Sequence, residues 1–233
     1  SIKSRRTSTM SPAIVLPARM ESTRFPGKAL IDMDGRPLIR RVFDICESFG
    51  YDTYVLTDSQ KIADVITKFN VIWTSPDCTD GTDRCLSAIG DELHYDKYIN
   101  VQGDTADPNI EVVKAIENAL DDHYVIQAHK KMTPTGQADP TVCKMVQTNN
   151  IVHWFVRSAL TYGDFALGYH GYTPEAKKRW NTFTHYNEEK IESIEAMRWI
   201  QNNDMLKTVQ VLDTGIEINT PEDYELWKKI ISD

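Results

Sequence analysis

From residue 13 to residue 128 the sequence alternates between short apolar runs and longer amphipathic stretches. The apolar runs are rich in β-favouring residues and predict strands at residues 13–16, 53–57, 71–73, 98–102 and 124–128. The stretches between them carry apolar residues at helical spacing and predict helices over residues 37–49, 62–69, 82–89 and 110–120. Buried strands that alternate with amphipathic helices form a largely parallel sheet with helices on both faces. The sequence therefore predicts an α/β fold.

The alternation changes after Lys130, and the second half of the chain predicts a mixed sheet. Strands are expected at residues 141–147, 151–156, 167–172 and 208–212, and helices over residues 189–201 and 221–231. Thr220 is the expected cap of the last helix. We expect a single domain over residues 12–233, with an inserted lobe at about 129–187. Residues 1–11 are polar and basic without periodicity, which predicts a flexible N-terminus.

Composition excludes several classes of protein. A chain of 233 residues with 41% hydrophobic content can bury one substantial core, and its net charge of −8 argues against nucleic-acid binding. No apolar stretch approaches the roughly 20 residues that span a bilayer, and the polar start lacks the apolar core of a secretory signal. We therefore expect a cytoplasmic protein without membrane insertion. The four cysteines have no C-x-x-C spacing, so we expect free thiols.

The loop that follows the first predicted strand is the first candidate site. Its sequence, PARMESTRFPGK at residues 17–28, contains three cations, two adjacent hydroxyls and a Pro-Gly turn. Arg19, Arg24 and Lys28 can offset the charge of a triphosphate, while the hydroxyls and loop amides donate hydrogen bonds. The loop is neither a Walker A motif nor a Rossmann fingerprint. It predicts a nucleotide-phosphate site, and for the cations alone the alternative is an exposed basic loop.

A second candidate site lies where the predicted central strand ends, in the sequence Gln102-Gly103-Asp104. Ligands gather at the carboxyl ends of parallel strands in open α/β sheets, and a carboxylate in that position can hold Mg²⁺. The alternative for Asp104 is a turn or helix-capping role. Asp107, three residues further on, is expected to be structural.

These motifs resemble those of the CMP-Kdo synthetases, the 3-deoxy-manno-octulosonate cytidylyltransferases. The loop is similar to the family pattern PAR-x-x-STR-x-PGK-x-L, VNVQGD to NVQGD, and TGIEINTPED at residues 214–223 to TG-V-D-TPEDL. The resemblance extends from about Ala13 to Ile231. It implies a three-layer α/β/α nucleotide-diphospho-sugar transferase fold of the glycosyltransferase-A type, and a homodimer. The implied reaction is Mg²⁺-dependent transfer of CMP from CTP to a 2-keto-3-deoxy sugar acid, with Kdo as the leading acceptor.

The resemblance also implies the residues around CTP. Catalytic roles fall on Arg19, Arg24, Lys28 and Asp104, the cations on the triphosphate and the carboxylate on the metal. Cytosine offers one amino donor and two acceptors, so carbonyls, hydroxyls and a cation suit its recognition. The expected nucleotide-binding residues are Ala18, Arg19, Ser22, Thr23, Lys28, Thr57, Asp58, Ser75, Gly81, Thr82, Arg84 and Gln102. Thr82 also fits an ordinary helix start, and both interpretations can hold.

The second metal position departs from the family pattern. The aspartate that precedes TPED in the family corresponds to Asn219, whose amide oxygen can coordinate Mg²⁺ but brings no charge. Glu217 lies two residues earlier and points to the same side of an extended segment, so it can supply the missing carboxylate. Capping of the last helix is the alternative role for Asn219.

The acceptor site is implied by weaker motifs. They place Arg157, His170, Tyr172, Glu192 and Glu195 around the sugar acid, with the Arg157 guanidinium suited to its carboxylate. Three positions depart from the family, namely Ala166 for His, His170 for Tyr and Arg198 for Glu. These departures leave open the same chemistry on an aminated Kdo, a sialic-type acid or a phosphonate. Asn219 leaves open a nucleotide-binding protein that has lost catalysis.

Overall fold

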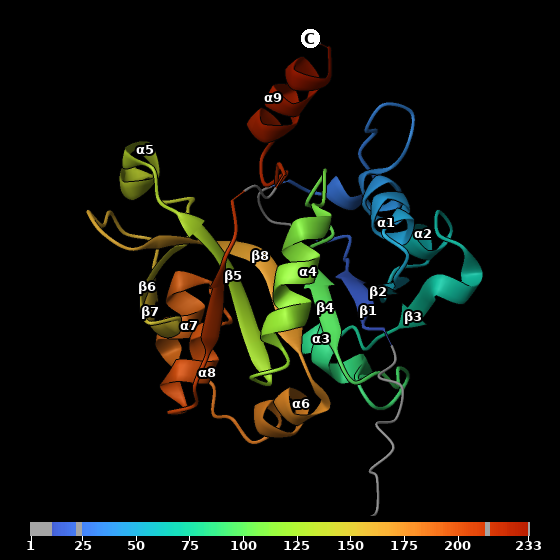
Figure 1. The fold of residues 1–233 in the computed structure, drawn as a ribbon. Coiled ribbons are helices and arrows are strands. Elements are labelled where there is room, and N and C mark those ends of the chain that lie inside the picture. Colours follow the sequence, from blue (N-terminus) through green and yellow to red (C-terminus); the bar gives the residue numbers. More distant parts are fainter. Residues whose placement is uncertain (1–10, 22–24, 213–214, 233) are drawn as a thin grey trace, which may run out of the picture.

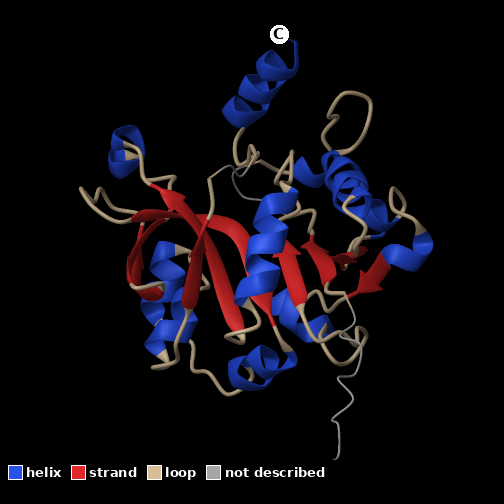
Figure 2. Cartoon of the chain, viewed as in Figure 1, coloured by secondary structure: helices blue, strands red, loops and turns tan. Residues whose placement is uncertain are grey.

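The computed structural model describes residues 11–21, 25–212 and 215–232. In these residues nine strands form one mixed sheet in the order β3-β2-β1-β4-β8-β5-β9-β7-β6, with helices on both faces (Figure 1; Figure 2). The α/β prediction is confirmed. The strands are β1 Ala13–Pro17, β2 Asp52–Thr57, β3 Val71–Trp73, β4 Tyr98–Val101, β5 Val125–Lys131, β6 Lys144–Thr148, β7 Ile151–Val156, β8 Asp164–Tyr172 and β9 Lys207–Gln210.

Short and long helices connect these strands. The α-helices are α1 Leu38–Ser48, α2 Gln60–Ala63, α3 Gly81–Ala88, α4 Ile110–Ala119, α5 Pro134–Ala138, α6 Pro174–Trp180, α7 Asn187–Glu192, α8 Met197–Gln201 and α9 Pro221–Ser232. The chain also forms two 3₁₀ helices, η1 Lys28–Leu30 between β1 and α1 and η2 Lys68–Asn70 between α2 and β3. None of the helices in the described residues is long and apolar enough to cross a membrane.

The side chains of the central strands alternate between two hydrophobic cores. Ile14 and Leu16 of β1 pack into the core that holds the apolar faces of α1 and α4, whereas Val15 packs into the core on the α3 side. Because successive side chains of a strand point to opposite faces, a strand covered on both sides must be apolar throughout. This requirement explains the unbroken apolar sequence of β1.

The direction of pairing brings several chain ends to one edge of the sheet. β1 pairs in parallel with both β2 and β4, while β8 runs antiparallel between β4 and β5. The carboxyl ends of β1 and β4 therefore lie beside each other. β6, β7 and β8 extend the same sheet, and the limits of a separate lobe at 129–187 stay a prediction. Of the predicted flexible N-terminus, residues 1–10 lie outside the described residues.

The predicted helix over residues 189–201 is wrong as a single element. The chain breaks at Ser193, which has a φ of 53°, and so separates α7 from α8. The break is held by Arg157, whose Nε donates to the carbonyl of Glu192 at 2.8 Å. A hydrogen bond to a carbonyl at the end of one helix stabilises that end, so tertiary contacts override the helical spacing of the sequence.

Candidate active site

The basic loop and the carboxylate after β4 meet at the carboxyl edge of the sheet. Lys28 Nζ forms an ion pair with Asp104 Oδ2 and donates to the carbonyl of Ile218 at 3.3 Å. The side chains of Lys28 and Asp104 are 18% and 21% exposed, so the pair lies in a cavity wall rather than in bulk solvent. The two motifs therefore converge as the sequence predicts. Ser22, Thr23 and Arg24 lie outside the described residues.

Close backbone packing makes this convergence possible. A Cβ atom at Gly103 would lie 2.9 Å from the carbonyl oxygen of Pro17 and 3.1 Å from Ile39 Cδ1. Real side chains do not approach backbone atoms so closely, so only glycine lets the turn after β4 pack against the end of β1.

A third segment, at residues 215–219, completes the edge. Ile218 N–H donates to the carbonyl of Asp104 at 2.9 Å, and Ala106 N–H donates to the carbonyl of Ile216 at 2.8 Å. This pairing places Glu217 beside Asp104. Burial and the negative charge of Asp104 raise the pKa of Glu217. Two carboxylates held this close form a site where a cation is stabilised.

The contacts of Asn219 bear on its two candidate roles, as a metal ligand and as a helix cap. Thr220 and Asp223 cap α9, because the Thr220 hydroxyl accepts from Asp223 N–H at 3.3 Å and Asp223 Oδ2 accepts from Thr220 N–H at 2.8 Å. The side-chain amide of Asn219 instead donates to Glu217 Oε2 at 3.5 Å. Its side chain thus faces the acidic site and leaves capping to its neighbours.

The donor set at this edge fits Mg²⁺. Asp104 and Glu217 offer carboxylate oxygens and Asn219 an amide oxygen, and oxygen atoms are the ligands that Mg²⁺ prefers. Within the described parts of the chain, no three His, Cys, Asp or Glu side chains group closely enough to hold a metal by themselves. A Mg²⁺ ion would therefore take further ligands from water and from substrate phosphates, as is usual for this metal.

Asp107 is structural, as expected from the sequence. Its carboxylate accepts from Arg41 Nη2 at 2.5 Å and from Trp227 Nε1 at 3.0 Å. Arg41 belongs to α1 and Trp227 to α9, and the guanidinium also lies 5.1 Å from the Trp227 ring. Asp107 thereby fixes both helices next to the segment that carries Glu217.

A cavity of about 320 Å³ opens beside the Lys28 and Asp104 pair. Six predicted nucleotide-binding residues line it, namely Ala18, Arg19, Lys28, Gly81, Arg84 and Gln102. We call this space the nucleotide cavity.

The structure does not bring every predicted nucleotide-binding side chain to this cavity. The Thr57 hydroxyl accepts from Ser59 N–H at 3.1 Å, and the Ser75 hydroxyl accepts from Asp77 N–H at 3.1 Å, so both stabilise local turns. Asp58 Oδ2 accepts from Arg84 Nη2 at 3.0 Å and so orients that guanidinium. Thr82 is buried.

A second cavity, of about 520 Å³, adjoins the first. Predicted acceptor residues Arg157, His170 and Glu195 line it, and we call it the acceptor cavity. The two cavities share lining residues, which are Gln102, Arg157, Ser193, Glu195, Glu217 and Asn219. The shared wall marks the place where a nucleotide in one cavity and an acceptor in the other would meet.

Two predicted acceptor residues have other contacts. The Tyr172 hydroxyl lies 3.1 Å from Thr82 Oγ1 in the buried interior, and Glu192 Oε2 accepts from the Arg157 backbone N–H at 2.9 Å. Neither lines the acceptor cavity. The Arg157 guanidinium, expected to face a substrate carboxylate, donates to backbone carbonyls of Thr141 and Glu192, each at 2.8 Å. These hydrogen bonds stabilise the end of α7 and so the break between α7 and α8.

His170 is buried in the lining of the acceptor cavity, and its imidazole is neutral. Burial lowers the pKa of its imidazole to about 4, so at pH 7 one ring nitrogen donates and the other accepts. Its Nδ1 has no hydrogen-bond partner in the described residues. A neutral imidazole in this position suits a sugar hydroxyl.

Several residues of the site were not predicted from the sequence. Lys130 and Gln127 reach the acceptor cavity because β5 pairs with β8, and local spacing gives no signal of that pairing. Asp80 lines the nucleotide cavity and also caps α3, with its Oδ1 accepting from Asp83 N–H at 2.8 Å. An aspartate three residues before Asp83 is a typical helix cap and could have been recognised in the sequence, but the sequence gives no sign that Asp80 lines the cavity.

The sheet order, the basic loop and the acidic edge define a nucleotidyltransferase of the nucleotide-diphospho-sugar transferase fold. The inositol-1-phosphate CTP transferase from T. maritima shares this fold, with a TM-score of 0.64 at 16% identity over 94% of this chain and 95% of its own. A solved CMP:2-keto-3-deoxy-manno-octonic acid synthetase complexed with CTP has a TM-score of 0.85 at 26% identity, over 95% of this chain and 99% of its own.

The chain belongs to the cytidylyltransferase family, whose model matches residues 13–211, and within it to the 3-deoxy-manno-octulosonate cytidylyltransferases. The curated 3-deoxy-manno-octulosonate cytidylyltransferase of Bartonella henselae is 31% identical over 244 residues, which cover 96% of this chain and 99% of that protein. The resemblance inferred from the motifs is thus confirmed over nearly the whole sequence.

Proposed function

We propose that the protein transfers CMP from CTP to the anomeric hydroxyl of 3-deoxy-manno-octulosonate (Kdo) and releases pyrophosphate. The observation that carries this proposal is the meeting of Lys28, Asp104 and Glu217 in the nucleotide cavity, with Glu217 in the wall that this cavity shares with the acceptor cavity. One cavity carries the phosphate-binding motif, and the other has room for a sugar acid. The known relatives act by this chemistry according to their names.

The site residues divide the work of the reaction. Arg19 and Lys28, together with Arg24, would offset the charge on the triphosphate and on the departing pyrophosphate. Asp104, Glu217 and Asn219 would hold Mg²⁺, which when bound neutralises phosphate charge and makes the attacking hydroxyl more acidic. Phosphoryl-type transfer needs mainly positioning and charge stabilisation, so no covalent nucleophile is required.

The position of the acceptor cavity fits an in-line attack. A hydroxyl in the acceptor cavity would reach the α-phosphorus across the shared wall, while Arg19 and Lys28, which line the nucleotide cavity but not the acceptor cavity, would hold the leaving pyrophosphate. Two cations, Lys130 and Arg157, line the acceptor cavity and can offset the carboxylate of a sugar acid. His170 can contact a hydroxyl of the same substrate. These features support an acidic, hydroxyl-rich acceptor.

A second carboxylate in the metal site favours catalysis over simple nucleotide binding. A protein with Asn219 alone beside Asp104 would hold Mg²⁺ weakly, because an amide brings no charge. Glu217 lies beside both Asp104 and Asn219, so its carboxylate could supply the missing charge. We therefore regard a catalytically impaired homologue as the less favoured alternative.

Pyrophosphate release by the purified protein tests this function. CTP, Mg²⁺ and Kdo should together yield pyrophosphate and CMP-Kdo, and UTP or ATP should not replace CTP. Aminated Kdo, a sialic acid and a phosphonate serve as competing acceptors in the same assay. Faster release with one of these would reassign the acceptor. Tight CTP binding without release for any acceptor would identify an inactive nucleotide-binding protein.

We also propose that the protein is a cytoplasmic homodimer. Trp154 on β7 is 41% exposed, and Tyr162 just before β8 is 61% exposed, so this end of the sheet presents aromatic surface that a second copy could cover. Light scattering on the purified protein measures its mass directly. A monomer at micromolar concentration would contradict the proposal.

A further inference from the structure

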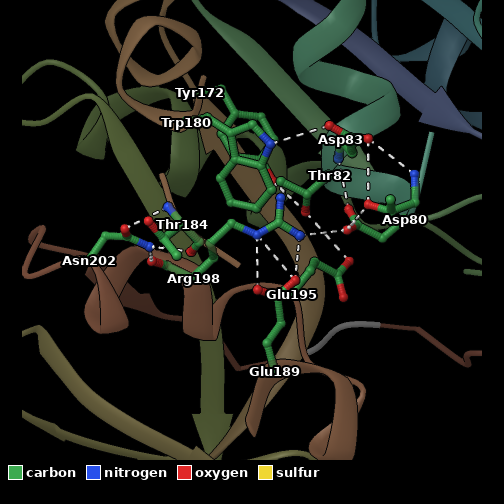
Figure 3. Close-up of polar contacts among 11 residues, drawn as sticks. Asp80, Thr82, Asp83, Tyr172, Trp180, Thr184, Glu189, Glu195, Arg198 and Asn202 are labelled. Atoms are coloured by element: carbon green, nitrogen blue, oxygen red, sulfur yellow. Dashed lines mark hydrogen bonds and ion pairs between the residues drawn. The ribbon is translucent and has the colours of Figure 1, made fainter. Parts of the chain in front are cut away.

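One arginine, Arg198, lies among the carboxylates of Asp80, Glu189 and Glu195 (Figure 3). Arg198 is fully buried, and its Nε donates to Glu189 Oε2 at 2.9 Å while its Nη2 donates to Asp80 Oδ2 at 3.1 Å. Its guanidinium also lies 3.9 Å from the centre of the Trp180 ring. The hydrogen bonds of Arg198 are therefore directed to two of the three acids.

The third acid, Glu195, is held differently. Its Oε1 accepts from the Thr82 hydroxyl at 3.5 Å, a long and therefore weak hydrogen bond. No lysine or arginine of the described residues forms an ion pair with it. Glu195 lines both the nucleotide cavity and the acceptor cavity, so its carboxylate stands where the two substrates would meet.

We propose that Glu195 is the general base that accepts the proton of the attacking anomeric hydroxyl. The inference rests on the proposed function and adds a step to it. As the hydroxyl oxygen forms its bond to the α-phosphorus, its proton passes to the Glu195 carboxylate. The bond between the α-phosphorus and the bridging oxygen breaks, and pyrophosphate leaves with that electron pair. The protonated carboxyl then returns its proton to water in the open cavity.

The electrostatic surroundings of Glu195 suit this task. Burial and the negative charge of Asp80 raise the pKa of Glu195 to about 7, while Arg198 acts in the opposite direction. A base works best when its pKa lies near the working pH, because it is then both ionised and basic. The titratable groups that face it from the packed elements are Asp80 and Cys85 at α3, Cys143 before β6, Tyr172 in β8, Glu189 in α7 and Arg198 in α8.

Arg198 is a positioning residue in this arrangement. By pairing with Asp80 and Glu189 it joins the start of α3, at the nucleotide cavity, to α7 and α8, at the acceptor cavity. Its charge also keeps the Glu195 pKa from rising further. Arg198 thereby keeps a substantial fraction of Glu195 ionised near neutral pH and holds together the elements around it.

Glu195→Gln tests the proposal, because it keeps the shape of the side chain and removes the proton acceptor. Single-turnover CMP transfer from CTP to Kdo should slow by about 100-fold, the usual effect of losing a general base, with CTP affinity within threefold of wild type. Glu195→Asp should recover part of the rate. Glu188→Gln, the same change at an exposed position of α7, is the matched control and should leave the rate unchanged.

The pH profile separates proton transfer from a structural role. The wild-type rate should fall below about pH 7 with the ionisation of Glu195, and this part of the acidic limb should be missing from Glu195→Gln. The phosphates of CTP titrate in the same pH range and affect every variant equally. The contribution of Glu195 is therefore the difference between the pH profiles of the wild type and of Glu195→Gln. A Glu195→Gln rate within threefold of wild type, or an unchanged acidic limb, would overturn the proposal. A wild-type protein that is inactive with CTP and Kdo would instead overturn the proposed function itself.

Discussion

The ionisation of Glu195 should make the stability of the free protein depend on pH, and Glu195→Gln should remove that dependence. Folding raises the pKa of Glu195 from 4.5 to about 7. Its contribution to stability is therefore complete below about pH 4.5 and is lost as the pH rises through about 7, because the folded state then has to hold a buried charge. Glutamine stays neutral throughout and avoids this cost.

The size of the effect follows from the two pKa values. A rise from 4.5 to about 7 corresponds to about 3.4 kcal/mol when the group is fully ionised. The carboxylate faces an open cavity, where water screens part of the cost, so we expect about 2 kcal/mol. For a chain of this length, such a gain raises the unfolding temperature by about 4 to 8 °C. At pH 5, just above the unfolded pKa of 4.5, this difference should shrink to about a quarter of its value at pH 8.

Thermal unfolding followed by calorimetry or circular dichroism at pH 5 and pH 8 measures this difference. The protein is studied without CTP and without metal, so the result does not depend on turnover. Glu188→Gln is the matched control, because its exposed carboxyl should give no pH-dependent difference. An unfolding temperature that differs from wild type by the same amount at both pH values would refute the electrostatic reasoning. Destabilisation by Glu195→Gln at pH 8 would refute it as well.

Three further changes test other parts of the site. Asp104→Asn should lower CMP transfer by about 100-fold or more and raise the Mg²⁺ concentration needed for half-maximal rate, while circular dichroism stays unchanged. Gly168→Ala would place a Cβ atom 2.9 Å from Gln102 Cγ and 3.0 Å from Glu217 Oε1, so it should cost about 1 to 3 kcal/mol in chemical unfolding and reduce turnover. Ser193→Val should cost about 2 kcal/mol, because a β-branched residue is strained at a φ of 53°, whereas a glycine there should be tolerated. Equal unfolding midpoints for the valine and glycine variants would contradict this account of the helix break.

The sequence predicts the phosphate side of the site well because that side depends on local signals. The apolar run of β1 and the Gly-containing turn after β4 each mark the carboxyl end of a buried strand. Parallel strands bring such ends to the same edge, so the meeting of Lys28 with Asp104 follows from topology. The pairing of residues 215–219 with this edge was expected only from family resemblance.

The acceptor side was harder to predict because long-range contacts determine it. Residues 189–201 have helical spacing throughout, and the break at Ser193 arises from contacts made by Arg157 in another part of the chain. An arginine at position 157 suggests carboxylate binding. In the structure, however, the N–H groups of its guanidinium donate to backbone carbonyls, one of them at the end of α7. Helix α6, by contrast, was missed although Thr173 and Pro174 form a recognisable helix start.

The strand-like pairing between residues 104–106 and 216–218 also determines when during synthesis the protein can become active. β1, its basic loop and β4 leave the ribosome early, but the carboxylate that faces Asp104 arrives only with residues 215–219, more than 100 residues after β4. A growing or truncated polypeptide that ends before residue 215 has the phosphate-binding loop without Glu217 and Asn219. Such fragments should be unable to release pyrophosphate, so activity requires that residues 215–219 have been synthesised and have paired with residues 104–106.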